Sequence, residues 1–317
     1  MFRRIWQITM IYLARSPFAA RFMQGNRTTS FLARKYVAGQ SPSHAVQRAR
    51  ELLEGGVRSS LFYLGEYVNS QELVAENVKN KLTITTLLGK FELDVHISVD
   101  PTQIGQSLNA DLAKVNAFKI AEAIRTTCAG KAGVHCLMLD MEDASVIDAT
   151  ISLHNELKQK EYPVALTLQA YLKRTASDMA AQVHAASRVR LVKGAFSASS
   201  NIAFTRQDDI KANFRSLVEI MFSREAREKG FYPIVATHDH RLHDFAIKIA
   251  RRNGWEAGQY EFEMLLGVRS NIARELALQG ERVRVYVPFG LDWWPYAVRR
   301  IGENPHNALL LARSLIQ

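Results

Sequence analysis

The sequence predicts an α/β fold, a (β/α)8 barrel preceded by N-terminal helices. Short apolar runs rich in β-forming residues recur along the chain, and longer segments with helical spacing of apolar residues separate them. Strands that alternate with helices form parallel βαβ units, and near-continuous apolar character is typical of strands buried on both faces. Eight such units favour a closed barrel over an open sheet.

The predicted strands share an apolar centre and cover residues 58–66, 91–100, 134–141, 162–171, 189–196, 232–240, 260–267 and 283–290. Segments between them, such as IDATISLHNELKQKE, show helical amphipathicity. Residues 18–56 are predicted to be helical, with a helix cap at Ser41 or Ser43. We therefore expect N-terminal helices over 1–56 and a flavin-binding barrel over 57–317, together forming a single catalytic domain.

Charge and composition limit the possible settings of the protein. The net charge of +10 favours an acidic partner such as nucleic acid or anionic lipid, or simply an enzyme with a basic surface. Residues 1–24 form a basic amphipathic pattern that could lie on an anionic membrane or pack on the protein body. No apolar run is long enough to span a bilayer. Because Cys128 and Cys136 are the only cysteines, we expect a reduced, cytoplasmic setting, with peripheral contact to the inner face of the cell membrane as an option.

Polar residues stand at the ends of the predicted strands, where a barrel of this type places its active site. They are Glu66, Asp100, Asp140, Gln169, Lys193, Thr237, His238, Asp239 and Tyr286. Each one alone could be a loop or capping residue. Their recurrence on many strands predicts a common site.

A second cluster follows the last predicted strand. The segment WWPYAVRRIGE contains Arg299 and Arg300, and Glu303 lies within one helical turn of both. Two adjacent guanidinium groups can grip a carboxylate with paired hydrogen bonds, so the cluster suits a small carboxylate substrate. A solvated, ion-paired helix is the alternative interpretation.

Several segments, in their order along the chain, resemble the proline dehydrogenase family. They are ARKYVAGQSPSHAVQRARELLEGGVRSSLFYLGE, LQAYLKRT, LVKGAF, IVATHD, YEFEMLLG, VRVYVPFG and WWPYAVRRIGE. The resemblance covers roughly residues 30–310. It implies a distorted barrel that binds FAD, oxidises L-proline or a related secondary amino acid to a pyrroline carboxylate, and passes electrons to a membrane quinone.

The resemblance also implies roles for single residues. Arg299 and Arg300 would hold the substrate carboxylate, and Glu303 would follow them beside the cofactor. Tyr286 would pack over the substrate ring, with Leu265 beneath it. Glu66 would pair with the first arginine and close the site.

The resemblance assigns a further set of residues to the flavin. Asp140 stands at the end of the third strand, and Arg190 would lie near the flavin N5, where a positive charge stabilises the reduced ring. The other implied cofactor contacts are Gln169, Val192, Lys193, Gly194, Ala195, Thr237 and His238. No metal is expected.

The sequence departs from the family pattern at the second strand. The stretch ISVDPTQIG places Asp100 where a pattern like SVKLTQLG has a lysine. A negative charge there disfavours a substrate carboxylate unless Asp100 is protonated or turned away. Phe196 replaces a tyrosine, and Glu263 replaces a glutamine. A flavoenzyme with an altered substrate is therefore an alternative.

Two other classes of protein compete with this interpretation. The residues Thr237, His238, Asp239, His240 and His243 could belong to a metal-dependent barrel hydrolase. A DNA-binding protein is conceivable from the charge, but no helix-turn-helix or zinc-finger spacing supports it, and no nucleic-acid partner is expected. The absence of a GxGxxG motif argues against a Rossmann dehydrogenase.

Overall fold

The computed structural model describes residues 35–65, 68–196 and 198–303, without the side chains of residues 299–303. The predicted membrane-contacting segment 1–24 and Glu66 lie outside these ranges. The backbone of Arg299, Arg300 and Glu303 is described, but their side chains are not.

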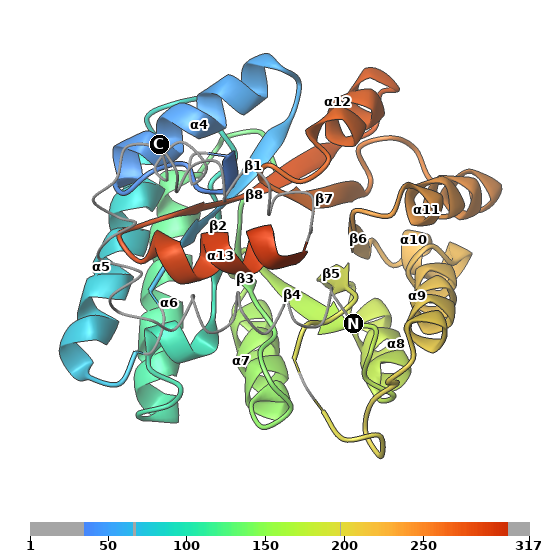
Figure 1. Cartoon of the computed structure of the whole chain (residues 1–317), viewed down its shortest axis with the longest axis horizontal. Coiled ribbons are helices and arrows are strands. Elements are labelled where there is room, and N and C mark those ends of the chain that lie inside the picture. Colours follow the sequence, from blue (N-terminus) through green and yellow to red (C-terminus); the bar gives the residue numbers. More distant parts are fainter. Residues whose placement is uncertain (1–34, 66–67, 197, 304–317) are drawn as a thin grey trace, which may run out of the picture.

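The centre of the fold is a closed barrel of eight parallel strands, which confirms the predicted fold class (Figure 1). The pairing of β1 with both β2 and β8 closes it. The strands are β1 Arg58–Tyr63, β2 His96–Val99, β3 Cys136–Leu139, β4 Val164–Gln169, β5 Arg188–Val192, β6 Tyr232–Ala236, β7 Glu261–Leu265 and β8 Val283–Phe289. Each predicted run overlaps one strand, although the strands are shorter than the runs and β5 begins one residue before its run. In the second run, residues 91–93 form a turn, so the strand begins at His96.

Helices surround the barrel and bury one face each against it (Figure 1). They are α5 Gln71–Leu88, η1 Pro101–Ile104, α6 Ala110–Thr127, α7 Ile147–Gln159, α8 Thr175–His184, α9 Gln207–Met221, α10 Arg224–Glu228, α11 His240–Arg252 and α12 Ser270–Leu278. Helix α9 shows the principle, because Ile210, Phe214, Leu217 and Met221 recur at helical spacing and are all buried.

The helix that precedes the barrel is α4, Pro42–Glu54. Its N-terminus is capped by Ser41, whose hydroxyl accepts from the backbone N–H of His44 at 3.4 Å, so Ser41 rather than Ser43 is the cap. The prediction of helix over 18–56 is wrong for residues 37–41, which lie alongside β8. There Ala38 N donates to Pro288 O at 2.9 Å. Gly39 has a φ of +136°, which breaks the helical path.

Two helices, α4 and α13 (Trp293–Glu303), do not belong to the ring of helices that connect successive strands. Helix α4 buries Ala45 and Ala49 in the main core and packs beside β1 and β8. The helix after β8, α13, instead packs Trp293 and Trp294 near Phe62 at the end of β1. Figure 1 shows α4 on the outside and α13 running across the front of the strands. The helix that carries the predicted arginine pair therefore lies at the barrel mouth.

Within the described ranges, no helix combines the length and apolar character that crossing a membrane requires.

Candidate active site

A cavity of about 790 Å³ opens at the C-terminal ends of the strands. Its size is in the usual range for a site that binds a small molecule or cofactor. The predicted site residues with described side chains all line it: Asp100, Asp140, Gln169, Arg190, Val192, Lys193, Gly194, Ala195, Thr237, His238, Leu265 and Tyr286. Tyr296 also lines the cavity, so helix α13 forms part of its wall.

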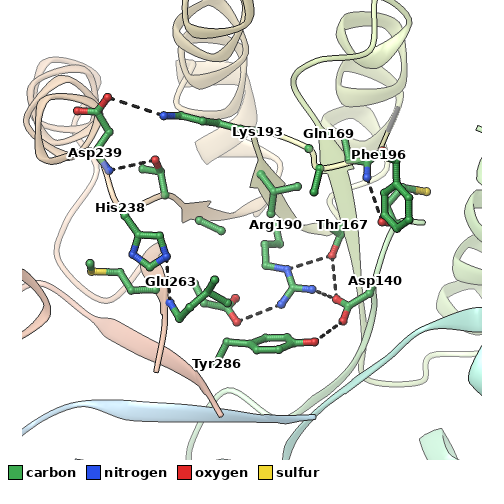
Figure 2. Close-up of a pocket in the computed structure, with 18 of the residues that line it drawn as sticks. Asp140, Thr167, Gln169, Arg190, Lys193, Phe196, His238, Asp239, Glu263 and Tyr286 are labelled. Atoms are coloured by element: carbon green, nitrogen blue, oxygen red, sulfur yellow. Dashed lines mark hydrogen bonds and ion pairs between the residues drawn. The ribbon is translucent and has the colours of Figure 1, made fainter. Parts of the chain in front are cut away.

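Arg190 is at the centre of the hydrogen-bond network at the base of the cavity (Figure 2). Residues alternate along β5, so Val189 and Leu191 face the surrounding core and Arg190 faces the barrel interior. Its guanidinium forms ion pairs with Asp140 and with Glu263 Oε1, the latter at 3.0 Å. Its Nε also donates to Thr167 Oγ1 at 3.0 Å. These contacts fix the guanidinium plane and largely balance its charge.

Tyr286 approaches the same network from β8. Its hydroxyl donates to Asp140 Oδ2 at 2.9 Å, and its ring lies 5.5 Å from the Arg190 guanidinium carbon (Figure 2). Burial and then the negative charge of Asp100 raise the pKa of Tyr286 well above its ordinary value. The phenol therefore stays protonated, and its hydroxyl acts as the hydrogen-bond donor that holds the Asp140 carboxylate.

Glu263 is the part of this network that the sequence identified only as a departure from the family pattern. It lies in β7, is buried, and has an Oε2 atom without a hydrogen-bond partner among the described residues. Burial raises the pKa of Glu263, and the opposing effect of Arg190 is smaller. The alternation in EFEML could have placed Glu261 and Glu263 inside the barrel, but not the pairing with Arg190.

Gln169 and Gly194 shape the opposite wall. Gln169 Nε2 donates to Met141 O at 3.0 Å, which leaves its Oε1 as a buried acceptor without a partner in the described part of the chain. Gly194 has a φ of +98°, and a Cβ there would lie 2.2 Å from the Tyr171 ring. Only glycine fits this turn, which brings backbone to the cavity edge.

Positive charge gathers at the outer end of the cavity. Lys193, Lys211 and Arg269 all line it. Burial lowers the pKa of Lys193, and Lys211 and Arg269 lower it further, while the charge of Asp239 opposes the shift. The Nζ of Lys193 lies 3.8 Å from Asp239 Oδ2. Mutual repulsion of these cations would be relieved by an anionic ligand.

Sequence reasoning identified Lys193 but missed Lys211 and Arg269. Lys211 is in helix α9, and Arg269 precedes helix α12, so neither follows a strand directly. Arg269 is brought to the cavity by a left-handed backbone conformation and by donating from Nη1 to His238 O at 3.0 Å. No sequence signal marks that turn.

The histidines after β6 are engaged in local contacts. Leu265 N donates to His238 Nε2 at 3.4 Å, and His243 Nε2 donates to Thr237 O at 2.9 Å. No group of three or more His, Cys, Asp or Glu side chains among the described residues is placed to hold a metal ion. The alternative of a metal-dependent hydrolase gains no support from this part of the chain.

Fold and site together define a barrel enzyme. Its mouth can hold a large ligand with an anionic end, and its reaction centre is buried and polar.

The chain matches one known protein family over most of its length. The family model described as proline dehydrogenase matches residues 45–313. Proline dehydrogenase 2 of Bacillus subtilis strain 168 is 31% identical over 299 residues, 94% of both chains. The proline dehydrogenase of Deinococcus radiodurans is 31% identical and is covered to 90%, as is this chain. This chain belongs to the proline dehydrogenase family.

Solved structures show the same fold at lower identity. Proline utilization A from Bdellovibrio bacteriovorus, inactivated by N-propargylglycine, matches 87% of this chain with a TM-score of 0.77 and 21% identity. The protein of that name from Corynebacterium freiburgense matches 99% with a TM-score of 0.74 and 19% identity. This chain spans about a third of each of those chains, 33% and 35%.

Proposed function

We propose that this chain is an FAD-dependent dehydrogenase that oxidises L-proline to 1-pyrroline-5-carboxylate. The observation that carries the proposal is the cavity at the barrel mouth, which has a cationic outer end and the Arg190 network at its base. Membership of the family supports the same assignment over most of the chain.

The residues of the cavity fit FAD. The partnerless acceptor Gln169 Oε1 suits a ring N–H, and Lys193, Lys211 and Arg269 suit the diphosphate. The backbone of 192–195, with Gly194 at its turn, and the pair Thr237 and His238 would line the cofactor. Bound FAD would supply the acceptor for the two electrons removed from the substrate.

The substrate would lie between the base of the cavity and helix α13. Leu265 and Tyr286 offer it an apolar and an aromatic surface. Removal of a hydride from the carbon beside nitrogen requires a neutral amine, and burial in such a pocket lowers an amine pKa. Arg299 and Arg300 would hold the carboxylate, and Glu66 and Glu303 would complete the closure. Placing these four side chains is part of the proposal, because all of them lie outside the described ones.

The proposal also includes the electron acceptor and the location of the protein in the cell. Electrons would leave through a quinone, and the chain would work in the cytoplasm on the inner face of the cell membrane. Contact would use residues 1–24, whose basic amphipathic pattern suits anionic lipid. Co-sedimentation with vesicles of phosphatidylglycerol, compared between the full chain and one lacking 1–24, tests this. Equal sedimentation of the two proteins would refute the proposed membrane contact through residues 1–24.

The central test is an absorbance spectrum of the purified protein followed by anaerobic addition of L-proline. We expect a flavin spectrum that bleaches with L-proline, and Asp140→Asn should slow bleaching by at least tenfold, because Asp140 holds both Arg190 and Tyr286. Asp148→Asn is the control, since Asp148 is exposed and pairs with Arg174 outside the cavity. A protein without flavin, or one that bleaches only with other amines such as N-alkyl amino acids, would contradict the proposal.

A further inference from the structure

A buried lysine, to which the proposed reaction assigns no role, lies near the rim of the cavity. Lys81 of helix α5 is 0% exposed. Its Nζ donates to Gln103 Oε1 at 2.9 Å and to Asn77 Oδ1 at 3.3 Å, and it lies 5.6 Å from the centre of the Tyr63 ring. These partners are neutral, so burial of the charged ammonium is only partly compensated.

Gln103 holds this ammonium in a fixed orientation. Its Nε2 donates to Tyr63 O at 3.0 Å and to Gly65 O at 3.2 Å, so its Oε1 must face Lys81. A Cβ on Gly65 would lie 2.8 Å from Asn77 Oδ1, so a larger residue there would displace the Asn77 amide from its place beside Lys81. Helix α5, the end of β1 and the 3-10 turn η1 are thereby joined around one cation.

The same turn carries Asp100 into the cavity. Gln103 N donates to Asp100 O at 3.0 Å, and the Asp100 residue lines the cavity beside Tyr286. Asp100 acts electrostatically on both sides, because its negative charge raises the pKa of Lys81 and that of Tyr286. Lys81 thus contacts the turn that carries Asp100, and Asp100 lines the cavity.

We propose that Lys81 is a positioning residue that sets the net charge of the rim at Asp100, and thereby the affinity of the pocket for a carboxylate substrate. The inference rests on the proposed function, since it concerns how L-proline is admitted. With Lys81 protonated, the two charges offset each other. With Lys81 neutral, Asp100 alone repels the substrate carboxylate.

Protonation of Lys81 changes in the physiological range. Burial lowers the pKa of Lys81 to about 7, with Asp100 opposing the shift. The KM for L-proline should therefore rise as pH increases through neutrality. Other ionisable groups lie near Lys81 or line the pocket, among them Tyr63, Glu76, Asp292, Asp140 and Glu263. Comparison with the lysine variant therefore assigns the pH step to Lys81.

The test is the pH dependence of kcat and KM for L-proline and for pyrrolidine, which lacks the carboxylate, from about pH 6 to about pH 9. In the wild type, KM for L-proline should rise roughly tenfold with pH, the size expected for one charge several ångströms away. Lys81→Met should give a high and flat KM, with kcat nearly unchanged. Asp100→Asn should lower KM and move the remaining step to lower pH. The control is Lys79→Met, which replaces an exposed lysine on the same helix; its KM and kcat should match those of the wild type at each pH.

Stability reports the titration of Lys81 independently of turnover. The pKa of Lys81 is about 7 in the folded protein and near its ordinary 10.5 in the unfolded chain, so the unfolded chain binds more protons between these values. The unfolding free energy should therefore rise with pH across this window, and Lys81→Met should lose that slope. This measurement also shows whether the variant is folded.

The outcomes separate the two proposals. Binding of L-proline by calorimetry, with the expected pH dependence but without oxidation, would refute the proposed reaction and keep the inference. The same pH step in the wild type and in Lys81→Met would overturn the inference, as would equal changes for L-proline and pyrrolidine. Failure of L-proline to bind at any pH would overturn both.

Discussion

Two arginines lie inside the same barrel, and each is paired with two carboxylates. Arg284 is near the N-terminal end of β8, whereas Arg190 is in the middle of β5 and its guanidinium reaches Asp140, just after the C-terminal end of β3. We call them, with their carboxylates, the lower cluster and the upper cluster. Each has one central arginine with one aspartate and one glutamate, although Arg58 and Arg282 also pair with the lower carboxylates. Their surroundings differ, and the difference separates a structural role from a chemical one.

The lower cluster is sealed. Arg284 is 0% exposed and donates to Asp94 Oδ2 at 2.8 Å, to both oxygens of Glu261 at 2.8 and 3.0 Å, and to Ser59 O at 2.8 Å. Burial lowers the pKa of Arg284, but Glu261 and Asp94 outweigh it and raise the pKa well above its ordinary value. Such a cluster holds together strands that are far apart in sequence.

The upper cluster opens onto the cavity. Arg190 pairs with Asp140 and Glu263, yet Glu263 Oε2 has no hydrogen-bond partner among the described residues, and Asp140 is shared with Tyr286. A cluster with an unused acceptor at a cavity can respond to a ligand. These two clusters indicate that exclusion from solvent, more than the types of side chain present, determines whether a buried ion cluster has a structural or a chemical role.

The largest effect should come from breaking the lower cluster. Arg284→Met leaves Asp94 and Glu261 buried without their main partner, so the unfolding free energy should fall by about 3–5 kcal/mol. Urea unfolding measures it. Arg206→Gln, in an exposed pair with Asp209 at 4.0 Å, is the matched control and should change little. Similar losses in the two variants would contradict the sealed role of Arg284.

Breaking the upper cluster should cost activity more than stability. Arg190→Gln removes the charge at the base of the cavity, and turnover should fall by roughly 10²–10³-fold. Its loss of stability should be smaller than that of Arg284→Met, because water in the cavity can solvate the freed carboxylates. Steady-state kinetics and urea unfolding of the same preparation check both. A stability loss equal to that of Arg284→Met would erase the distinction between the clusters.

A single hydroxyl sharpens the comparison. Tyr286→Phe removes the 2.9 Å hydrogen bond to Asp140, and turnover should fall about tenfold, as for a loss of about 1.5 kcal/mol. Tyr232→Phe removes a weaker contact, 3.4 Å, to Glu261 in the lower cluster and should leave kinetics unchanged. If the Tyr232 variant is slowed as much as the Tyr286 variant, proximity to the cavity is not what matters.

The smallest expected effect is an opposite response of the clusters to pH. Burial raises the pKa of Asp94, but Arg284, Arg58 and Arg282 together outweigh it and lower this pKa below its ordinary 3.8. The stabilisation by the Asp94 carboxylate is therefore present above that value and is lost as pH falls through the folded pKa. The pKa of Glu263 is raised above 4.5, so its ionisation costs stability as pH rises.

Near neutral pH, Asp94→Asn should therefore destabilise and Glu263→Gln should stabilise, each by on the order of 1 kcal/mol. Both differences should shrink towards acid pH, because the wild-type carboxyls become protonated there too. Urea unfolding at several pH values measures them. Changes of the same sign in the two variants would refute the opposite shifts.

The fold was largely predictable because its signals are local. Each strand overlaps an apolar run, and closed-barrel topology puts the residues after these runs at one end. Several described site residues were predictable for the same reason, because Asp140 and Gln169 lie at strand ends. Tyr286 instead lies in the middle of β8. Lys211 and Arg269 were missed because a helix and a left-handed turn bring them to the cavity.

The resemblance to a family supplied roles that local patterns could not. It pointed to Arg190 and marked Asp100 and Glu263 as departures. It did not show that Glu263 pairs with Arg190, or that Lys81 contacts the turn that carries Asp100, because these contacts depend on side chains from different elements. Roles for Glu66, Arg299, Arg300 and Glu303 stay predictions.

The sequence by itself determined the eight strands, the helices between them and the end of the barrel that carries polar groups, because backbone period and burial are written into neighbouring residues. Tertiary structure decided which charges meet. Asp94 and Arg284 are 190 residues apart, and only closure of the barrel joins them. It also decided that α4 covers the barrel side and α13 the mouth. Both helices have an apolar face, so only the surfaces available in the folded barrel could choose between them.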